Sequence, residues 1–349
     1  MNDDERRAAT HRRATPAGHF ELGPGAEFDL VRAFLAELSA GASGIGSDCA
    51  AVTMPPNAKL VLSTDTSVEG VHFRRSWLTP AEIGYRAAAA ALSDLAAAAA
   101  TPVAILLAIA APPEWVAGLP AVVGGVGAAA REAGTVVVGG DTTAGPVLAL
   151  TVTVAGASER PLDRAGARPG DRVYVTGRFG APGAAIRAWT QGVEPEATTR
   201  ERFAHPVARL RESRWLAAHA ATAAIDVSDG LVADLRHLAA ASRAHLSVDL
   251  DRLPLWPGVM VLDAAASGEE YELAVTAASP VDTVAFEREF GVPLTHIGDV
   301  LAGSPAVEVT SGGVRIAAIQ GYDHFSASPP LGSELGSELG PERRDPGSR

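Results

Sequence analysis

Apolar residues recur along this chain with two different periods, which predicts alternating helices and strands. Phe28, Val31, Phe34 and Leu38 lie three or four residues apart and predict a first helix over residues 27–38. Further helices are predicted to begin at Thr79-Pro80 and to span residues 119–133, 181–189, 209–220 and 231–241. Short apolar runs predict strands at residues 59–63, 103–110, 135–138, 147–154, 172–176, 223–227, 245–249, 271–276, 294–299 and 306–309. Strands interleaved with helices in this way are typical of an α/β (α+β) fold.

A cluster of glycine, proline and charged residues from Ala155 to Gly170 predicts a boundary between two domains. The N-terminal domain is expected over residues 26–157, and a C-terminal α/β domain over residues 158–326. Residues 1–25 carry charges but no apolar run, and we expect a disordered arm without a secretory signal. Residues 327–349 contain a tandem GSEL repeat and are expected to be a disordered tail.

The most hydrophobic stretch runs from Ala87 to Ala111 and has the length of a membrane span. It contains Asp94 in its first half and Pro102 in its middle, and a bilayer would have to bury that aspartate at high cost. We therefore expect an alanine-rich buried helix followed by a strand, and no membrane association.

Composition narrows the classes of function. The formal net charge of −12 argues against a nucleic-acid partner and suits a protein that gathers metal cations. Cys49 is the only cysteine, so the chain has no internal disulfide and fits a reducing, cytoplasmic location. Lys59 is the only lysine, and no P-loop motif, which requires a lysine, occurs.

Two apolar runs lead directly into aspartates surrounded by hydroxyls and glycines. Leu60–Leu62 leads into Ser63-Thr64-Asp65, and Val136–Val138 leads into Gly139-Gly140-Asp141. Any single aspartate at a strand end is most often a turn former or a helix cap. Asp65, Asp141 and Asp226 nevertheless all follow or end such runs, and we expect the three at one edge of a sheet.

Further acidic segments strengthen the pattern: Asp48 in GSDCA, Asp94 between Leu92 and Leu95, and Asp229 in IDVSDG. Converging carboxylates repel one another unless a cation neutralises them, and oxygen ligands without histidine or cysteine select Mg²⁺ or Ca²⁺. Magnesium held by a few carboxylates usually shares its coordination with phosphate oxygens. The pattern therefore predicts metal-dependent phosphoryl transfer without a P-loop.

Three other residues leave alternatives open. His72 either caps its loop or contacts a substrate beside Asp65. Cys49 fits a packed small residue better than a reactive thiol. Asp234, near the start of a predicted helix, fits a solvent-facing or capping role.

The ordered set of short motifs resembles the thiamine-monophosphate kinase family from about Phe28 to Phe325. The motifs are GIGSDCA, STDTSVEGVHF, GYRAAAAALSDLAA, GGDTTAGP, RAGARPGD, AIDVSDGL, SGEEYEL and GYDHF. The resemblance implies two domains of the aminoimidazole-ribonucleotide-synthetase-like fold, with the N-terminal sheet forming a homodimer. It also implies transfer of the γ-phosphoryl group of ATP to thiamine monophosphate, which gives thiamine diphosphate.

The resemblance implies roles for individual residues. The magnesium shell would comprise Asp48, Ser63, Thr64, Asp65, Asp94, Asp141, Asp226 and Asp229. Of these, Asp65, Asp141 and Asp229 would act in catalysis. ATP would contact Gly140, Asp141, Arg164 and Ser228, and thiamine monophosphate would contact His72, Glu270 and Tyr322. The acceptor already carries ionised phosphate oxygens, so positioning and charge neutralisation would do most of the catalysis.

The sequence departs from the family pattern in two motifs. Ser47 stands before Asp48 where the family usually has a second aspartate. The family's Gly-Gly-Glu-Asp-Tyr-Glu is here Ser-Gly-Glu-Glu-Tyr-Glu, residues 267–272. Glu270 keeps the charge of the family's aspartate but is longer by one methylene.

Two rival readings follow. Related ATP enzymes of this fold need features that the chain lacks, such as a reactive cysteine with a lysine in the N-terminal arm or a C-terminal cysteine. A degenerate kinase that only binds thiamine phosphates or ATP is favoured solely by Ser47. The five aspartates at 48, 65, 94, 141 and 226 argue against it, because a sensor has no need for every metal ligand.

Overall fold

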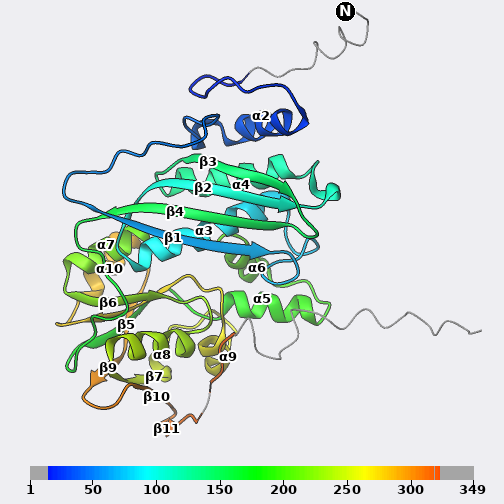
Figure 1. Ribbon diagram of the computed structural model, residues 1–349. Helices are drawn as coiled ribbons and strands as arrows, with labels where there is room; N and C mark the ends of the chain where they lie inside the picture. The colour runs from blue at the N-terminus through cyan, green and yellow to red at the C-terminus, as the bar shows by residue number, and fades with distance from the viewer. Residues whose placement is uncertain (1–14, 318, 323–349) are drawn as a thin grey trace, which may run out of the picture.

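The computed structural model describes residues 15–317 and 319–322, and in them the chain forms two sheets. Figure 1 shows the N-terminal sheet above the C-terminal sheet, with α5 and α6 beside the junction. The two sheets with their helices confirm the expected fold class.

The N-terminal sheet has four strands in the order β1-β4-β2-β3. The strands are β1 (Lys59–Val68), β2 (Thr101–Ala111), β3 (Val137–Ala144) and β4 (Ala149–Ser158). The helical elements are α2 (Ala26–Leu38), η1 (Ser39–Gly41), α3 (Pro80–Ala97), η2 (Pro113–Trp115) and α4 (Leu119–Glu132). β4 runs antiparallel to both β1 and β2, and β3 runs parallel to β2. β1 and β3 are thus the two edges of this sheet.

Helix α3 packs against this sheet and begins with the predicted cap. The Thr79 hydroxyl accepts the N–H of Glu82, and the Glu82 carboxylate accepts the N–H of Thr79. A Cβ at Gly84 would lie 1.8 Å from the carbonyl oxygen of Val122 in α4, so only glycine permits this close helix contact. The helix ends at Ala97 and β2 follows, as expected for the hydrophobic stretch. Within the described residues, every helix is too short or too polar to cross a bilayer.

Among residues 15–317 and 319–322, the opposite face of the N-terminal sheet is left open. Leu60, Leu62 and Leu106 are 54%, 61% and 43% exposed there. On the same face the hydroxyls of Thr64 and Thr153 lie 3.0 Å apart, as strand neighbours do. The exposed leucines give this face an apolar surface.

The C-terminal sheet has seven strands in the order β11-β10-β7-β9-β5-β8-β6. The strands are β5 (Arg172–Thr176), β6 (Ala221–Asp226), β7 (His245–Asp249), β8 (Leu273–Ala277), β9 (Leu294–Leu301), β10 (Ala306–Ser311) and β11 (Val314–Arg315). The helices are α5 (Ala181–Thr190), α6 (Ala197–Ala204), α7 (Leu210–Ala218), α8 (Leu231–Ser242), η3 (Leu250–Arg252), α9 (Val261–Ala266) and α10 (Thr283–Phe290). Helix α8 packs on β6, β7 and β10 through buried leucines.

Helix α6 joins the two domains. Arg200 donates to both oxygens of Glu82 at 2.8 and 2.9 Å, and Arg86 of α3 donates to the Phe203 carbonyl. Trp77 stacks on Trp189 with ring centroids 5.0 Å apart. These contacts hold α3 and the α5–α6 segment together at the edge of the cavity described below.

Several sequence expectations need correction. β1 continues to Val68 and β3 to Ala144, so Asp65 and Asp141 lie within strands rather than at their ends. Helices α6, α9 and α10 were not predicted, because each is short and flanked by loops. Part of the expected N-terminal arm is docked: Leu22 is buried, and its carbonyl accepts from Arg32. Residues 1–14 and the predicted tail, 327–349, lie outside the described residues.

Candidate active site

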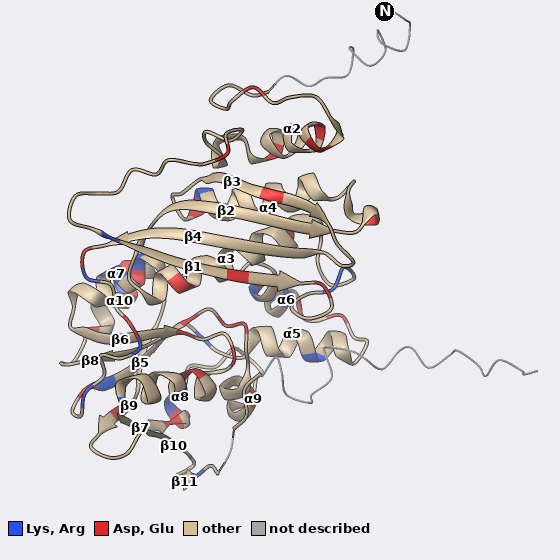
Figure 2. Ribbon diagram, viewed as in Figure 1, with Lys and Arg blue, Asp and Glu red and all other residues tan. Residues whose placement is uncertain are grey.

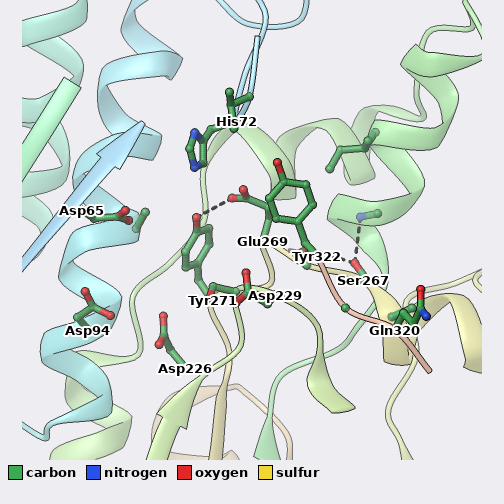
Figure 3. Close-up of a pocket in the computed structure, with 18 of the residues that line it drawn as sticks. Asp65, His72, Asp94, Asp226, Asp229, Ser267, Glu269, Tyr271, Gln320 and Tyr322 are labelled. Carbon is green, nitrogen blue, oxygen red and sulfur yellow. Dashed lines mark hydrogen bonds between the residues drawn. The ribbon is translucent and has the colours of Figure 1, made fainter. Parts of the chain in front are cut away.

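A cavity of about 480 Å³ lies between the two domains, and acidic side chains from both converge on it. Asp65 comes from the middle of β1, Asp94 from α3, Asp226 from the end of β6, and Asp229 from the loop that follows. Figure 3 shows these four carboxylates on facing walls. The structure thus brings together four of the predicted metal ligands.

The carboxylates lie near one another in a buried site, which disfavours their ionised forms. Burial and then the charges of Asp94 and Glu269 raise the pKa of Asp65 to about 6. Burial and then the charge of Asp94 raise the pKa of Asp226 to about 7. Burial also raises the pKa of Asp94, although the Ser63 hydroxyl donates to its Oδ2 at 2.5 Å. A cation would relieve this repulsion.

Ser63 and Thr64 lie on opposite faces of β1. Ser63 and Asp65 point toward α3, as the Ser63–Asp94 hydrogen bond requires. The Thr64 hydroxyl meets Thr153 on the open face, and Thr64 still lines the cavity because β1 is an edge strand. Ser63 is therefore bonded to one of the carboxylates, whereas Thr64 borders the cavity with its hydroxyl on the other face of β1.

The loop after β6 is fixed by a buried carboxylate. Oδ2 of Asp234, in the first turn of α8, accepts the N–H groups of Ser228, Asp229 and Gly230 at 3.1, 3.1 and 3.2 Å. Asp234 is almost fully buried, so the capping alternative holds and the solvent-facing one is wrong. The loop thereby presents Ser228 and Asp229 to the cavity.

Residues 267–271 form the wall next to this loop and contain two strained positions. Glu269 and Tyr271 have φ angles of 62° and 50°, in the left-handed region that costs about 1–3 kcal/mol per residue. Both side chains line the cavity, and the Tyr271 hydroxyl donates to Glu269 Oε2 at 2.6 Å. Arg86 pairs with the same Glu269 oxygen and lies over the Phe203 and Tyr271 rings. The strained turn therefore delivers two neighbouring side chains to one site.

The structure supports both alternatives for His72. Its Nδ1 accepts the Val68 N–H at 3.1 Å, which fixes the ring on its own loop. The ring also lines the cavity, between Asp65 and Tyr322 in Figure 3. Tyr322 lines the same region, and its N–H donates to the Asp229 carbonyl at 2.9 Å. The two predicted substrate residues are thus close to the acidic cluster.

Glu270 is the predicted substrate residue that does not line the cavity. Its side chain is fully buried, and Oε1 accepts the Gly180 N–H at 2.6 Å. Burial raises its pKa to about 8. The side chains of residues 269 and 271 line the cavity, whereas the side chain between them is buried. The prediction that Glu270 contacts the substrate directly therefore needs correction. Glu269 and Tyr271 line the cavity wall in its place.

Three other predicted site residues lie away from this cavity. Asp48, Gly140 and Asp141 line a separate cavity of about 290 Å³ beside α2. β1 and β3 are opposite edges of the N-terminal sheet, so the expectation that Asp65, Asp141 and Asp226 share one sheet edge is wrong. The acidic segments of β1 and β3 are well separated in Figure 2. Gly140 has a structural explanation as well, since a Cβ there would lie 1.8 Å from the Leu107 carbonyl oxygen.

Arg164 and Cys49 complete the account of the predicted residues. Arg164 does not line the cavity, but its positive charge is close enough to oppose the raised pKa of Asp94 and of Asp226. Cys49 is exposed and borders a third cavity with Phe20 and Val52, so the expectation of a packed residue is wrong.

Sequence reasoning missed several wall residues: Arg187 of α5, Asp263 of α9, Ser267, Glu269 and Tyr271. The motif SGEEYEL drew attention to the region of the last three, but the left-handed conformations at residues 269 and 271 are not apparent from it. No periodic pattern reveals such a turn.

The donor set fits a hard divalent cation that keeps water or phosphate ligands. In the described residues no group of three or more histidine, cysteine, aspartate or glutamate side chains is arranged to hold a metal ion alone. Magnesium usually takes only one or two carboxylates and completes its shell with waters and phosphate oxygens. Asp94, whose charge raises the pKa of both Asp65 and Asp226, is suited with them to that arrangement.

Comparisons with known proteins agree with this architecture. The family model for the AIR synthase related protein, N-terminal domain, matches residues 46–158, and the model for the C-terminal domain of the same class matches residues 168–310. Structures of the hydrogenase maturation protein HypE share the fold, with a TM-score of 0.71 at 21% identity in one case. The two domains and the cavity between them thus define an AIR synthase related protein.

Relatives with higher sequence identity indicate one family within this class of proteins. Thiamine-monophosphate kinase of Salmonella typhimurium is 36% identical over 86% of this chain and 96% of its own length. The enzyme of Escherichia coli K12 is 34% identical over the same shares. The crystal structure of thiamine-monophosphate kinase from Stenotrophomonas maltophilia K279a has a TM-score of 0.72 at 34% identity, covering 84% of this chain and 97% of that one. The chain belongs to the thiamine-monophosphate kinase family.

One structure of a relative contains ligands. AaThiL complexed with AMPPCP and TMP has a TM-score of 0.68 at 28% identity, covering 86% of this chain and 97% of that one. A fold of this kind therefore binds an ATP analogue together with TMP.

Proposed function

We propose that this protein is a thiamine-phosphate kinase, which converts thiamine monophosphate and ATP into thiamine diphosphate and ADP. The observation that carries the proposal is the cluster of Asp65, Asp94, Asp226 and Asp229 around a cavity of about 480 Å³, in a chain 36% identical to such a kinase. A phosphate oxygen of thiamine monophosphate attacks the γ-phosphorus of ATP. The bond from that phosphorus to the bridging oxygen breaks, and ADP leaves with the electron pair.

The carboxylate cluster is the proposed magnesium site. Asp65, Asp94, Asp226 and Asp229 would hold the ions, with Ser63 and Thr64 beside them. Bound magnesium would neutralise the charge of the phosphates as the transfer proceeds. The chain's own residues supply orientation: Ser228 and the loop fixed by Asp234 on the ATP side, and His72, Tyr322, Glu269 and Tyr271 on the acceptor side. Arg164 lies near enough to add positive charge where phosphoryl groups gather.

A homodimer follows as part of the proposal. Asp48 and Asp141 line a cavity at the β3 edge of the N-terminal sheet, whereas Asp65 lies on β1 at the other edge. One copy therefore does not bring together all the metal ligands predicted from the sequence. The open sheet face, with Leu60, Leu62 and Leu106, can pack on a second copy. A two-fold arrangement can place the β3 edge of one copy beside the β1 edge of the other. Asp141 of the second copy would then lie next to Asp65.

The acceptor is tested by measuring ADP release with a panel of compounds. Thiamine monophosphate should support turnover. Free thiamine and a phosphate monoester without the thiazolium ring, such as pyridoxal phosphate, should not. Turnover with free thiamine would contradict a phosphate acceptor. Binding of ATP and thiamine monophosphate without any ADP release would favour the degenerate binding protein.

The raised pKa values predict a pH-dependent effect of magnesium on stability. Asp65 and Asp226 have folded-state pKa values of about 6 and 7, above the ordinary 3.8. A raised pKa means that these groups favour folding below pH 4 and lose that contribution as pH rises through 6 to 7. Glu82 does not interfere in this window: burial alone would raise its pKa, but its bonds to Arg200 and Thr79 lower it to about 2.

Magnesium should therefore raise the melting temperature more at pH 8, where the carboxylates are ionised, than at pH 5. Thermal unfolding is measured at two Mg²⁺ concentrations on the order of millimolar, about fivefold apart, and without Mg²⁺. Asp94→Asn is the matched variant, because it removes one charge and keeps an acceptor for Ser63. An equal magnesium effect at both pH values, or one unchanged in Asp94→Asn, would count against the site.

A further inference from the structure

Helix α5 forms one wall of the cavity, and two side chains from a distant loop hold its first turn. Oε1 of Glu270 accepts the Gly180 N–H at 2.6 Å, and Oγ of Ser267 accepts the Gly183 N–H at 3.0 Å. The first N–H groups of a helix have no partner within the helix, and Gly180 supplies no capping side chain. The loop therefore provides the cap that the sequence of α5 lacks.

The contact between loop and helix is close. A Cβ at Gly183 would lie 2.7 Å from the Ser267 Oγ, so the helix approaches the loop at a position without a side chain. Glu270 is fully buried beneath the loop, and its backbone carbonyl also accepts from Arg202. We call this pair of contacts, Ser267 to Gly183 and Glu270 to Gly180, the α5 latch.

The same loop is hydrogen-bonded to the segment that directly follows β6, beside the acidic cluster. The Glu269 N–H donates to the Ser228 carbonyl at 2.7 Å, and the Tyr271 N–H donates to the Val227 carbonyl at 2.8 Å. The loop thus joins the end of β6 on one side and α5 on the other. The distance from α5 to the acidic cluster is set through this loop.

Helix α5 contributes an apolar and a cationic residue to the cavity wall, Ile186 and Arg187. Arg187 pairs with Asp263 of α9 at 3.3 Å. Ser267 and Tyr322 lie together on one side of Figure 3, and Asp94 and Asp226 lie on the other. If phosphates and cations occupy the carboxylate side, the wall of α5 and Tyr322 faces the organic part of the acceptor.

We propose that Ser267 and Glu270 are positioning residues that hold α5, with Ile186 and Arg187, against the acceptor end of the cavity and thereby set the affinity for thiamine monophosphate. This inference rests on the proposed function. The two residues are also the positions at which the loop differs from the family's Gly-Gly-Glu-Asp pattern. Each difference adds the atoms that reach α5: a hydroxyl at 267 and a methylene at 270.

The test uses two variants that shorten the latch, Ser267→Ala and Glu270→Asp, in the full chain. Steady-state kinetics are measured with thiamine monophosphate and ATP varied separately. The expected result is a rise of about fivefold in KM for thiamine monophosphate in each variant, with kcat and KM for ATP changed less than about twofold. Amide hydrogen exchange in α5 should become faster in both variants, with no substrate present.

Two matched controls separate positioning from general damage. Glu270→Gln keeps the length and an oxygen acceptor and should behave as the unaltered protein. Ser311→Ala removes a hydroxyl bonded to Asp251 at 2.9 Å in β10 and should leave both KM values unchanged. Equal rises in both KM values, unchanged KM for thiamine monophosphate, or a Glu270→Gln variant as impaired as Glu270→Asp would overturn the inference.

The exchange measurement distinguishes the two proposals. An unaltered protein without turnover would reject the proposed function, while faster exchange in α5 would still support the latch. Unaltered exchange in the variants, beside normal turnover, would reject the latch and leave the proposed function standing.

Discussion

Asp65→Asn is expected to lower turnover by on the order of 10³-fold, because it removes a charge at the proposed centre of phosphoryl transfer. The side chain keeps its size and one oxygen. Burial and the charges of Asp94 and Glu269 already disfavour the ionised form of Asp65. The ligand-free variant should therefore melt at the same temperature as the unaltered protein, or higher, at pH 8.

The measurement combines kcat at saturating substrates with thermal unfolding. Asp282→Asn is the matched control, since it makes the same change at the exposed N-cap of α10, where asparagine caps as well as aspartate. The control should retain full turnover. Near-normal activity in Asp65→Asn, or a loss explained by unfolding, would remove Asp65 from the proposed metal site.

Asp141→Asn is expected to be equally inactive by itself and to regain activity when paired with Asp65→Asn in a mixed dimer. The reason is the strand order β1-β4-β2-β3, which puts Asp65 and Asp141 on opposite edges of one sheet. If a centre combines Asp65 of one copy with Asp141 of the other, the mixed dimer has one centre with both aspartates and one with neither. About half of the native turnover should return, as two-fold symmetry requires.

The mixed dimer is prepared by co-expressing the two variants with different affinity tags and purifying on both. Each variant purified alone serves as the control. Mixed dimers as inactive as either parent would show that the two aspartates do not act in a shared centre. Full activity in Asp141→Asn alone would remove Asp141 from the site.

Local signals in the sequence predicted the elements well where each element carries its own cap or period. Thr79 and Glu82 form a capping box, and the helix begins there. β1 was cut short because Ser63, Asp65 and Ser67 are polar. The alternation with exposed Thr64 and Thr66 is nevertheless that of an edge strand with one open face. The alternation of exposed and less exposed side chains therefore continues through Ser63–Ser67, although these residues are polar.

The assembly of the site depended on information that a single sequence does not contain. Of the six aspartates grouped from the sequence, Asp65, Asp94, Asp226 and Asp229 converge on one cavity, and Asp48 and Asp141 line another. Strand order comes from pairing between distant segments, so the placement of Asp141 at another edge was not predictable from its local pattern. The burial of Glu270 was not predictable either, because the motif SGEEYEL does not reveal the left-handed backbone at residues 269 and 271.

The central claim is the reaction itself, and the most direct measurement is the formation of thiamine diphosphate by the purified protein. Thiamine monophosphate and ATP are incubated with Mg²⁺, with EDTA, and with EDTA followed by excess Mg²⁺, and the product is separated and quantified against the ADP formed. We predict one thiamine diphosphate per ADP, loss of product with EDTA, and recovery when magnesium is restored. ADP without thiamine diphosphate, or product formation that is indifferent to EDTA, would contradict a magnesium-dependent thiamine-phosphate kinase.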